Sequence, residues 1–235
     1  MAKKCYIPGV KYSVLKSGNH WESQEFKKGV HNGEDLISRT PTTKASACSI
    51  IAIDDGTVSF VGYSKTRGYY IELKHQVGKS RYLHMKKDSI KVKLGEKVKR
   101  GQTLGMMGAT GEGVTGTHLH LAIIINGNYV DPYPYLMGYY ILNLKIGNYT
   151  LIENKYIRTS PEVKATNKVK YVKVDSDLKE NFQKDKFGYA RYKVGVTVHV
   201  NEIKKDKKGN YWGKTRNTWF CMFDKTGYQC MCDGE

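Results

Sequence analysis

The stretch "TGTHLHLAIIINGNYVDP", residues 115–132, places two histidines at the head of an apolar run. In a β-strand, residues i and i+2 point to the same face, so His118 and His120 would project side by side. On a helix the same spacing would send them to different sides. The β-branched run at 123–125 and the Asn-Gly turn at 126–127 favour a strand. The stretch therefore predicts two imidazoles that share one pocket.

Short alternating runs separated by glycines continue this pattern on both sides of the stretch. In "GYYIELKHQ", residues 68–76, Tyr69, Ile71, Leu73 and His75 would share one strand face. The segment "VKLGEKVKRGQTLG" indicates a turn in which glycines 101 and 105 adopt backbone angles that other residues resist. The chain has 24 Gly, 18 Tyr and only 5 Pro, which suits many strands and turns. We expect a mainly β protein built of antiparallel sheet.

The formal net charge is +17 in 235 residues, and basic side chains are spread over both halves of the chain. Such a surface favours a polyanionic partner, which is a nucleic acid, an anionic membrane or an anionic bacterial wall. A lysine-rich solvated surface without a partner explains the charge equally well. The N-terminal residues lack the apolar core of a signal peptide, and no run is long enough to span a membrane. We expect synthesis as a soluble cytosolic chain.

The cysteines are odd in number and lack CxxC spacing, so the sequence indicates neither a disulfide framework nor a thiolate zinc site. Reduced thiols are the expected state in a cytosol. Pairing among three of them after release to an oxidising medium stays open. The five are Cys5, Cys48 and these three, Cys221, Cys230 and Cys232.

A second group of metal-binding side chains lies upstream, in "GVHNGEDLIS", residues 29–38. His31 and Asp35 stand four residues apart around a glycine. Catalytic zinc takes three protein ligands and leaves a fourth position open. Together with His118 and His120, these residues supply enough donors for such a site and one spare imidazole. Each of the motifs HxxxD and HxH, taken by itself, also occurs by chance in proteins without a metal site.

The order of these motifs resembles a known family. HxxxD at 31–35 is followed by "RYLHM" at 81–85, "VKLGEKVKRGQTLGMMGATG" at 92–111 and "TGTHLHLAIIINGNYVDPYPYL" at 115–136. This series is similar to the M23 zinc peptidases, also called LytM or lysostaphin-type endopeptidases, over about residues 28–136. The resemblance implies an antiparallel β-sheet peptidase that cuts peptide bonds of bacterial peptidoglycan.

The resemblance also implies a role for each polar residue of the motifs. His31, Asp35 and His120 match the ligands of one Zn²⁺ per chain. His118 and His84 match the two catalytic histidines. Either imidazole could take a proton from water, donate it to the leaving amine or stabilise an oxyanion, and the sequence leaves open which one is the base.

Other polar residues near the motifs receive no catalytic role. Glu34 departs from the family, which has an apolar residue there, and we expect it to face solvent. Asp131 matches a position that caps the last strand. Three isolated histidines are expected to be surface or hydrogen-bonded residues, namely His20, His75 and His199.

Two prolines within "DPYPYLMG" end the strand pattern, and a new pattern begins after them. We therefore expect a peptidase domain at 1–138, a linker at 139–147 and a second domain at 148–235. The second domain resembles a bacterial SH3 cell-wall-binding barrel, with Arg158 and Pro161 in its first turn.

Aromatic grooves on such barrels bind extended peptides. The candidates here are Tyr211, Trp212, Trp219 and Tyr228, although packing in the domain core explains each of them equally well.

A peptidase followed by an SH3 domain resembles a phage endolysin, which is made in the host cytoplasm and acts at the wall after release. We expect a monomer that acts on Gram-positive peptidoglycan, without nucleic acid and without membrane insertion. The alternative is a LytM-like protein that has lost catalysis and only binds or regulates the wall. A nucleic-acid-binding protein would need a recognised motif or a clustered basic stripe, and the sequence offers neither.

Overall fold

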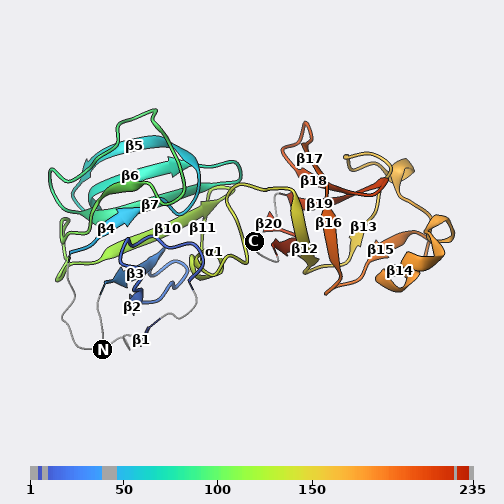
Figure 1. The fold of residues 1–235 in the computed structure, drawn as a ribbon, viewed down its shortest axis with the longest axis horizontal. Coiled ribbons are helices and arrows are strands. Elements are labelled where there is room, and N and C mark those ends of the chain that lie inside the picture. The colour runs from blue at the N-terminus through green and yellow to red at the C-terminus, as the bar shows by residue number, and fades with distance from the viewer. Residues whose placement is uncertain (1–4, 7–9, 39–46, 225–226, 233–235) are drawn as a thin grey trace. The chain divides into compact units, whose positions relative to one another are not determined.

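The computed structural model describes residues 5–6, 10–38, 47–224 and 227–232. The chain divides into two compact units, Met1–Asn143 and Leu144–Glu235. Both units consist of antiparallel strands, so the prediction of a mainly β protein is confirmed (Figure 1). Among the helices of the described residues, none has the length and apolar character that crossing a bilayer requires.

The first unit is built on one large antiparallel sheet with the order β1-β2-β3-β10-β7-β6-β5-β8, in which β11 also pairs with β10. A two-stranded sheet of β4 and β9 completes the strands of this unit. The strands are β1 (Cys5–Tyr6), β2 (Trp21–Gln24), β3 (Glu34–Ile37), β4 (Ser49–Ile51), β5 (Gly56–Ser64), β6 (Gly68–Lys74), β7 (Lys79–Met85), β8 (Lys97–Val98), β9 (Thr103–Met106), β10 (Leu119–Ile125) and β11 (Asn128–Val130). A short helix, α1 (Tyr133–Leu136), follows β11.

Strand β10 lies between β3 and β7 and carries the apolar run that the sequence marks as a strand. Leu119, Leu121 and Ile123 are fully buried, and Ala122 on the opposite face is 1% exposed. A strand buried on both faces is typically a near-continuous apolar run, which is the sequence pattern of β10. This strand lies inside the large sheet and begins beside the candidate site.

The glycine-rich segment before β9 behaves only partly as predicted. Gly101 has a φ of 78°, in the left-handed region. Gly105 lies inside β9 and its φ is not positive, so that part of the prediction is wrong. A Cβ at Gly105 would lie 2.5 Å from the Met85 Cε and 3.0 Å from the Ser89 carbonyl oxygen. Gly105 is required there for space and not for its backbone angle.

Residues of the expected linker pack against the first unit. Ile141 and Leu142 are 5% and 1% exposed. The Asn143 side chain donates a hydrogen bond to the Asp55 carbonyl oxygen (2.7 Å), and its backbone N–H donates to Asp54 Oδ2 (3.1 Å). The chain is therefore held against the first unit up to Asn143, the last residue of that unit.

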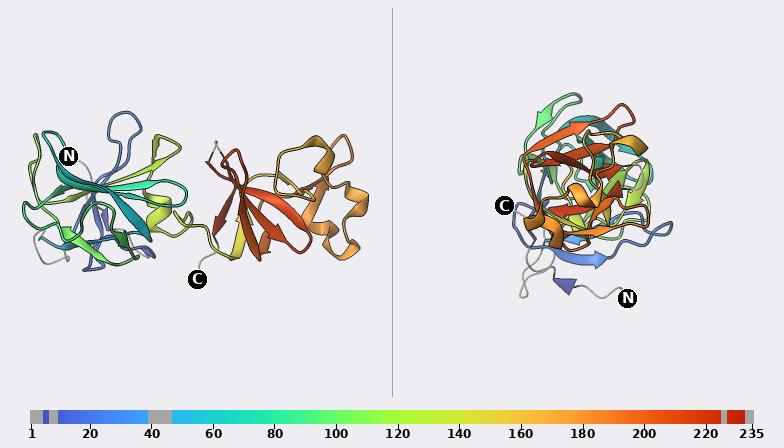
Figure 2. Two further views of the ribbon diagram at one scale, coloured as in Figure 1. Left: turned by 90° about the horizontal axis from the view of Figure 1, so that it is seen from above. Right: turned by 90° about the vertical axis from the view of Figure 1, so that its right-hand side faces the viewer.

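The strands of the second unit, coloured yellow to red in Figure 2, form three small antiparallel sheets. Within this unit β16 packs beside β18 and β13 packs beside β19. The orders of the three sheets are β16-β12-β21, β13-β15-β14 and β17-β18-β19-β20. The strands are β12 (Gly147–Leu151), β13 (Lys155–Tyr156), β14 (Phe182–Lys184), β15 (Ala190–Tyr192), β16 (Thr197–Val200), β17 (Glu202–Lys205), β18 (Tyr211–Thr215), β19 (Thr218–Asp224), β20 (Gly227–Tyr228) and β21 (Cys230–Cys232). Three 3-10 helices, η1 (Ala165–Asn167), η2 (Tyr171–Lys173) and η3 (Ser176–Asn181), lie between β13 and β14.

Arg158 is a buried residue that connects parts of this second unit. Its side chain is 7% exposed and donates hydrogen bonds to the Lys164 carbonyl oxygen (2.6 Å) and to Asn167 Oδ1 (2.8 Å). Because the guanidinium also lies 5.9 Å from the centre of the Trp212 ring, it joins the first turn to β18. The cysteines of the unit include Cys221, which is a free thiol whose burial raises its pKa to about 12.

His75 forms a buried polar cluster in the first unit, where it is 7% exposed. Its Nδ1 lies 2.6 Å from the Asp55 carbonyl oxygen, and its Nε2 lies 2.8 Å from Ser80 Oγ, which in turn lies 3.1 Å from the Tyr82 hydroxyl. Burial lowers the pKa of His75 below its ordinary value, so the folded state holds a neutral imidazole. The unfolded chain then binds a proton more readily than the folded chain as the pH falls below about 6.5.

We expect the free energy of unfolding of the first unit to respond more favourably to acidification from pH 7.5 to 5.5 in His75→Gln than in the parent protein, because the variant lacks an imidazole that the unfolded chain protonates more readily than the folded chain. Urea unfolding followed by tryptophan fluorescence at both pH values measures the effect. Amide hydrogen exchange of peptides from each unit at the same urea concentrations assigns the transitions, and the second unit serves as the internal control. Equal pH dependence in the variant and the parent protein would contradict this role of His75.

Candidate active site

The site forms where the loop before β3, the end of β7 and the start of β10 meet in the large sheet (Figure 1). In the register between β10 and β3, His120 lies directly opposite Asp35. Residues opposite each other in an antiparallel pair point to the same face, so the imidazole and the carboxylate meet. His31 precedes β3 and lies four residues before Asp35, which completes a group of three.

The three donor atoms of this group converge closely. His120 Nδ1 lies 2.8 Å from Asp35 Oδ1, His31 Nε2 lies 3.1 Å from the same oxygen, and the two imidazole nitrogens lie 3.1 Å apart. Donor atoms in a tetrahedral zinc site are about 3.3 Å apart, given metal–ligand bonds of about 2.0–2.1 Å. Two imidazoles and one carboxylate are also the ligand types of catalytic zinc. The residues present therefore fit a small divalent metal ion.

The electrostatics of the three residues favour a charged carboxylate. Burial by itself would raise the pKa of Asp35, but hydrogen bonds from His120 and His31 and the nearby histidines hold this pKa well below its usual range. Burial likewise opposes protonation of His31, yet its bonds to Asp35 and to the Glu25 carbonyl raise its pKa. The side chains are 12–14% exposed, so the group remains open to solvent on one side.

His84 and His118 lie beside this group, as the sequence predicted for two residues far apart in the chain. Their ring centres are 4.8 Å apart, and the His84 ring centre is 5.8 Å from that of His120. His118 Nε2 lies 3.7 Å from Asp35 Oδ1. The structure thus brings all five predicted residues together, while their individual roles stay predictions.

An irregular register and a strained backbone hold His84 in place. On β6, Tyr69 pairs with Met85 and Ile71 pairs with Tyr82, which leaves an extra residue in β7 and bends the strand there. His84 itself has a φ of 60°, a left-handed conformation that is uncommon for residues other than glycine. Backbone strain of this kind clusters at functional sites.

Backbone carbonyls orient three of the imidazoles. His31 Nδ1 lies 2.7 Å from the Glu25 oxygen, His84 Nδ1 lies 2.9 Å from the Thr110 oxygen, and His118 Nδ1 lies 2.8 Å from the Gly116 oxygen. Since a carbonyl oxygen only accepts, each Nδ1 carries the proton and leaves Nε2 directed into the site. Burial lowers the pKa of His84 to about 4, so this imidazole is neutral at physiological pH.

Glu34 does not face solvent, and that expectation is wrong. Its side chain points to the sheet face opposite Asp35, shared with Leu36 and Leu121, and the residue is 1% exposed. Burial raises its pKa to about 9, with further contributions from the negative charges of Glu22 and Asp131. Glu34 is therefore neutral at pH 7 and adds no charge to the site, which leaves Asp35 as the anionic donor of the metal-binding group.

Gly33 lies against the candidate site, and the sequence signals it only as the glycine inside HxxxD. A Cβ built on Gly33 would run into His120 Nε2 and would lie 2.6 Å from the Leu121 carbonyl oxygen. Its φ is not in the left-handed region, so the requirement is one of space. The carbonyls of Glu25, Thr110 and Gly116 had no signal in the sequence, because a backbone oxygen does not depend on residue type.

Most of the aromatic residues predicted for wall binding lie in the core of the second unit. Tyr211, Trp212 and Trp219 are 6%, 1% and 5% exposed, and Trp212 Nε1 donates to Asp206 Oδ2 (3.0 Å). Rings this deeply buried have little surface for an extended peptide, so packing explains these three. Tyr228 is partly exposed.

Comparison with known proteins finds similarity over part of the first unit. Residues 29–132 match peptidase family M23. Peptidoglycan DD-endopeptidase ShyC of Vibrio cholerae serotype O1 is 36% identical over 103 residues, which are 43% of this chain and 22% of that protein. Peptidoglycan DD-endopeptidase ShyB of the same organism is 39% identical over 102 residues, again 43% and 22%. The matched region is thus about a fifth of the length of these relatives.

Solved structures give similar matches. A zinc-containing peptidase from Vibrio cholerae is 33% identical, with a TM-score of 0.42 over 54% of this chain and 39% of that chain. The catalytic domain of lysostaphin from Staphylococcus simulans is 28% identical, with a TM-score of 0.39 over 57% and 92%.

We expect Gly33→Ala to weaken Zn²⁺ binding by about 10–100-fold, because the added methyl group displaces His120 from the donor triangle. Isothermal calorimetry on metal-free protein measures the affinity. Gly116→Ala is the matched control, since a Cβ there meets nothing within 4 Å and the φ is not left-handed. Equal affinity in Gly33→Ala and Gly116→Ala would refute the packing argument.

Proposed function

We propose that the protein is a zinc-dependent endopeptidase that hydrolyses peptide bonds of bacterial peptidoglycan. The match of residues 29–132 to peptidase family M23 supports this proposal. The observation that carries the proposal is the convergence of three donor atoms within 3.1 Å of one another, with two further imidazoles beside them. A purely structural cluster would not need three imidazoles within 3.7 Å of one carboxylate oxygen and a fourth beside them.

The proposed cofactor is one Zn²⁺ per chain, held by His31, Asp35 and His120. Zinc in such a site supplies Lewis-acid chemistry, which polarises a carbonyl group and lowers the pKa of a water molecule to about 7. Two neutral imidazoles and one carboxylate leave a net charge near +1 at the site. Asp35 is suited to this role because its carboxylate stays ionised at any physiological pH.

His84 and His118 are the proposed acid–base residues. His84 is neutral, and the proton on its Nδ1 is fixed by the Thr110 carbonyl, so its Nε2 is free to accept a proton. His118 Nε2 is the second nitrogen that can accept or donate a proton at the site. The two ring centres are 4.8 Å apart, so one bound peptide group can reach both.

Peptidoglycan is the proposed substrate because the named relatives are peptidoglycan DD-endopeptidases. The bond would lie in the stem peptide or in the cross-bridge. The net charge of +17 favours an anionic wall, and a second β unit attached to the peptidase would raise the effective concentration of enzyme at the wall. We propose that this second unit is an SH3-type wall-binding domain and that the protein acts as a monomer on Gram-positive walls.

Digestion of purified Gram-positive peptidoglycan tests the enzymatic proposal. New amino groups should appear without new reducing sugars, and mass spectra of the fragments would identify the bond. His118→Ala should lower the rate by at least about 100-fold, in line with the contribution of an acid–base group. A zinc chelator should abolish release, and added Zn²⁺ should restore it.

Binding to walls of several chemotypes without any amine release would contradict catalysis. The protein would then be a wall-binding or regulatory protein on an M23 scaffold. Circular dichroism of His118→Ala and of the chelated protein separates loss of catalysis from loss of fold.

We further propose that the protein is a phage endolysin, synthesised in the host cytoplasm and acting at the host wall after release. Expression inside a Gram-positive cell should then leave the culture turbid until a membrane-permeabilising protein is co-expressed, after which turbidity falls. Lysis at the same rate without that second protein would contradict the release step.

A further inference from the structure

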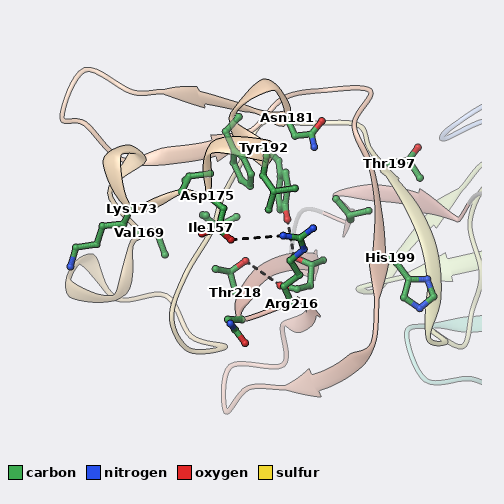
Figure 3. A pocket seen from close by; sticks show the side chains of 16 residues that line it. Ile157, Val169, Lys173, Asp175, Asn181, Tyr192, Thr197, His199, Arg216 and Thr218 are labelled. Atoms are coloured by element: carbon green, nitrogen blue, oxygen red, sulfur yellow. Dashed lines mark hydrogen bonds and ion pairs between the residues drawn. The ribbon is translucent and has the colours of Figure 1, made fainter.

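A cavity of about 430 Å³ opens in the second unit, and none of its lining residues belongs to the strands that carry the candidate active site (Figure 3). It lies where the segment η2–η3, strand β16 and the turn between β18 and β19 come together. Its volume falls in the range of small-ligand pockets, roughly 300–1,000 Å³. All of its lining residues belong to one compact unit.

The floor of the cavity is apolar and well packed. Ile157, Phe182 and Tyr192 are 2%, 4% and 6% exposed. The rings of Phe182 and Tyr192 stack with their centres 4.3 Å apart, and the Tyr192 hydroxyl lies 2.8 Å from Thr215 Oγ1. The Tyr192 hydroxyl already has a hydrogen-bond partner. A ligand can therefore place small apolar groups on this floor without leaving a buried hydroxyl unpaired.

The rim carries side-chain amides with hydrogen-bonding capacity to spare. Within the part of the chain that the structure describes, the side chains of Asn181 and Asn217 make no hydrogen bond, although both line the cavity. A side-chain amide offers donors and an acceptor, the same groups that a peptide backbone presents. This rim therefore matches a peptide better than a hydrocarbon.

Charged groups of both signs stand at one end. Arg216 Nη1 lies 3.8 Å from Asp175 Oδ2 and 3.4 Å from Asp177 Oδ2, and all three side chains are 62–70% exposed. Ion pairs this exposed contribute little to stability, so a ligand can exchange with them. Arg216 and the Asp175 carboxylate thus provide a site for a carboxylate and a site for an ammonium group.

The backbone of Arg216 supports a binding role. It lies in a two-residue turn between the paired residues Thr215 and Thr218, with a φ of 48°. Glycine, asparagine and aspartate are preferred in such turns, and an arginine there is under strain. A strained position that keeps a long charged side chain at the mouth of a cavity is more typical of function than of stability.

We propose that this cavity binds a short zwitterionic peptide, with Arg216 taking its carboxylate, Asp175 taking its ammonium group and the amides of Asn181 and Asn217 bonding its backbone. The inference rests on the proposed function, because the peptides of a bacterial wall carry free carboxylates and amines. It deepens that function by assigning wall binding to the cavity and not to the buried tryptophans.

Calorimetric titration of the full-length protein with the tetrapeptide N-acetyl-L-Ala-γ-D-Glu-L-Lys-D-Ala, in which the lysine amine is the single ammonium group, tests the proposal. Amidating its carboxylates or acetylating its lysine amine should each weaken binding by about tenfold, which is the usual loss of one charge-assisted hydrogen bond. Arg216→Gly should weaken binding of the parent peptide similarly and leave the amidated peptide unaffected. Asp175→Asn should do the same with the acetylated peptide.

Arg216→Gly relieves the left-handed φ, so a loss of binding in this variant cannot be attributed to misfolding. Lys208→Ala, which removes an exposed charge in another turn of the same unit, is the matched control and should bind normally. Equal binding by Arg216→Gly and the parent protein would overturn the proposal. So would equal affinity for a glycan strand that lacks peptide.

Amine release from walls is measured in parallel with the same protein. Digestion of walls without any binding of the tetrapeptide would overturn the cavity assignment alone and leave the enzymatic function standing. Arg216-dependent peptide binding without digestion would support the cavity and count against catalysis.

Discussion

The antiparallel pairing of β10 with β3 sets the geometry on which the rest of the site depends. In this register His120 faces Asp35, and on the other side of β10 it pairs with Leu83, next to His84. A shift of one residue would move His120 to the opposite face of the sheet and break the donor triangle. Such a shift is unfavourable because it would place the His120 imidazole on the face where Leu119 and Leu121 are fully buried. Packing of the core therefore fixes the distances between polar groups at its edge.

Within that frame, backbone carbonyls determine which nitrogen of each imidazole faces the site. Three histidines donate through Nδ1 and present Nε2, whereas His120 approaches Asp35 and His31 through Nδ1. The difference follows from chain geometry, because His120 lies within a strand and its Nε2 lies close to Gly33. The small residue at position 33 and the orientation of His120 are thus parts of one arrangement.

The two units use charge in different ways. In the first, Glu34 is buried and neutral, so the negative charge of the metal-binding group resides on Asp35. In the second, the buried Arg158 supports the fold, while the exposed Arg216 lines a cavity. Burial and hydrogen bonding, and not residue type, separate a structural arginine from one available to a ligand.

The sequence by itself determined the strand character of residues 119–125 and the adjacency of His118 and His120, since both follow from a period of two and from β-branched composition. The family motifs added His31, Asp35 and His84 as members of one site. Only the tertiary structure decided the burial of Glu34, the packing of Tyr211, Trp212 and Trp219, and the bulge that aims His84. Each of these depends on what lies across from a residue in space, and local sequence carries no information about a partner that is tens of residues away.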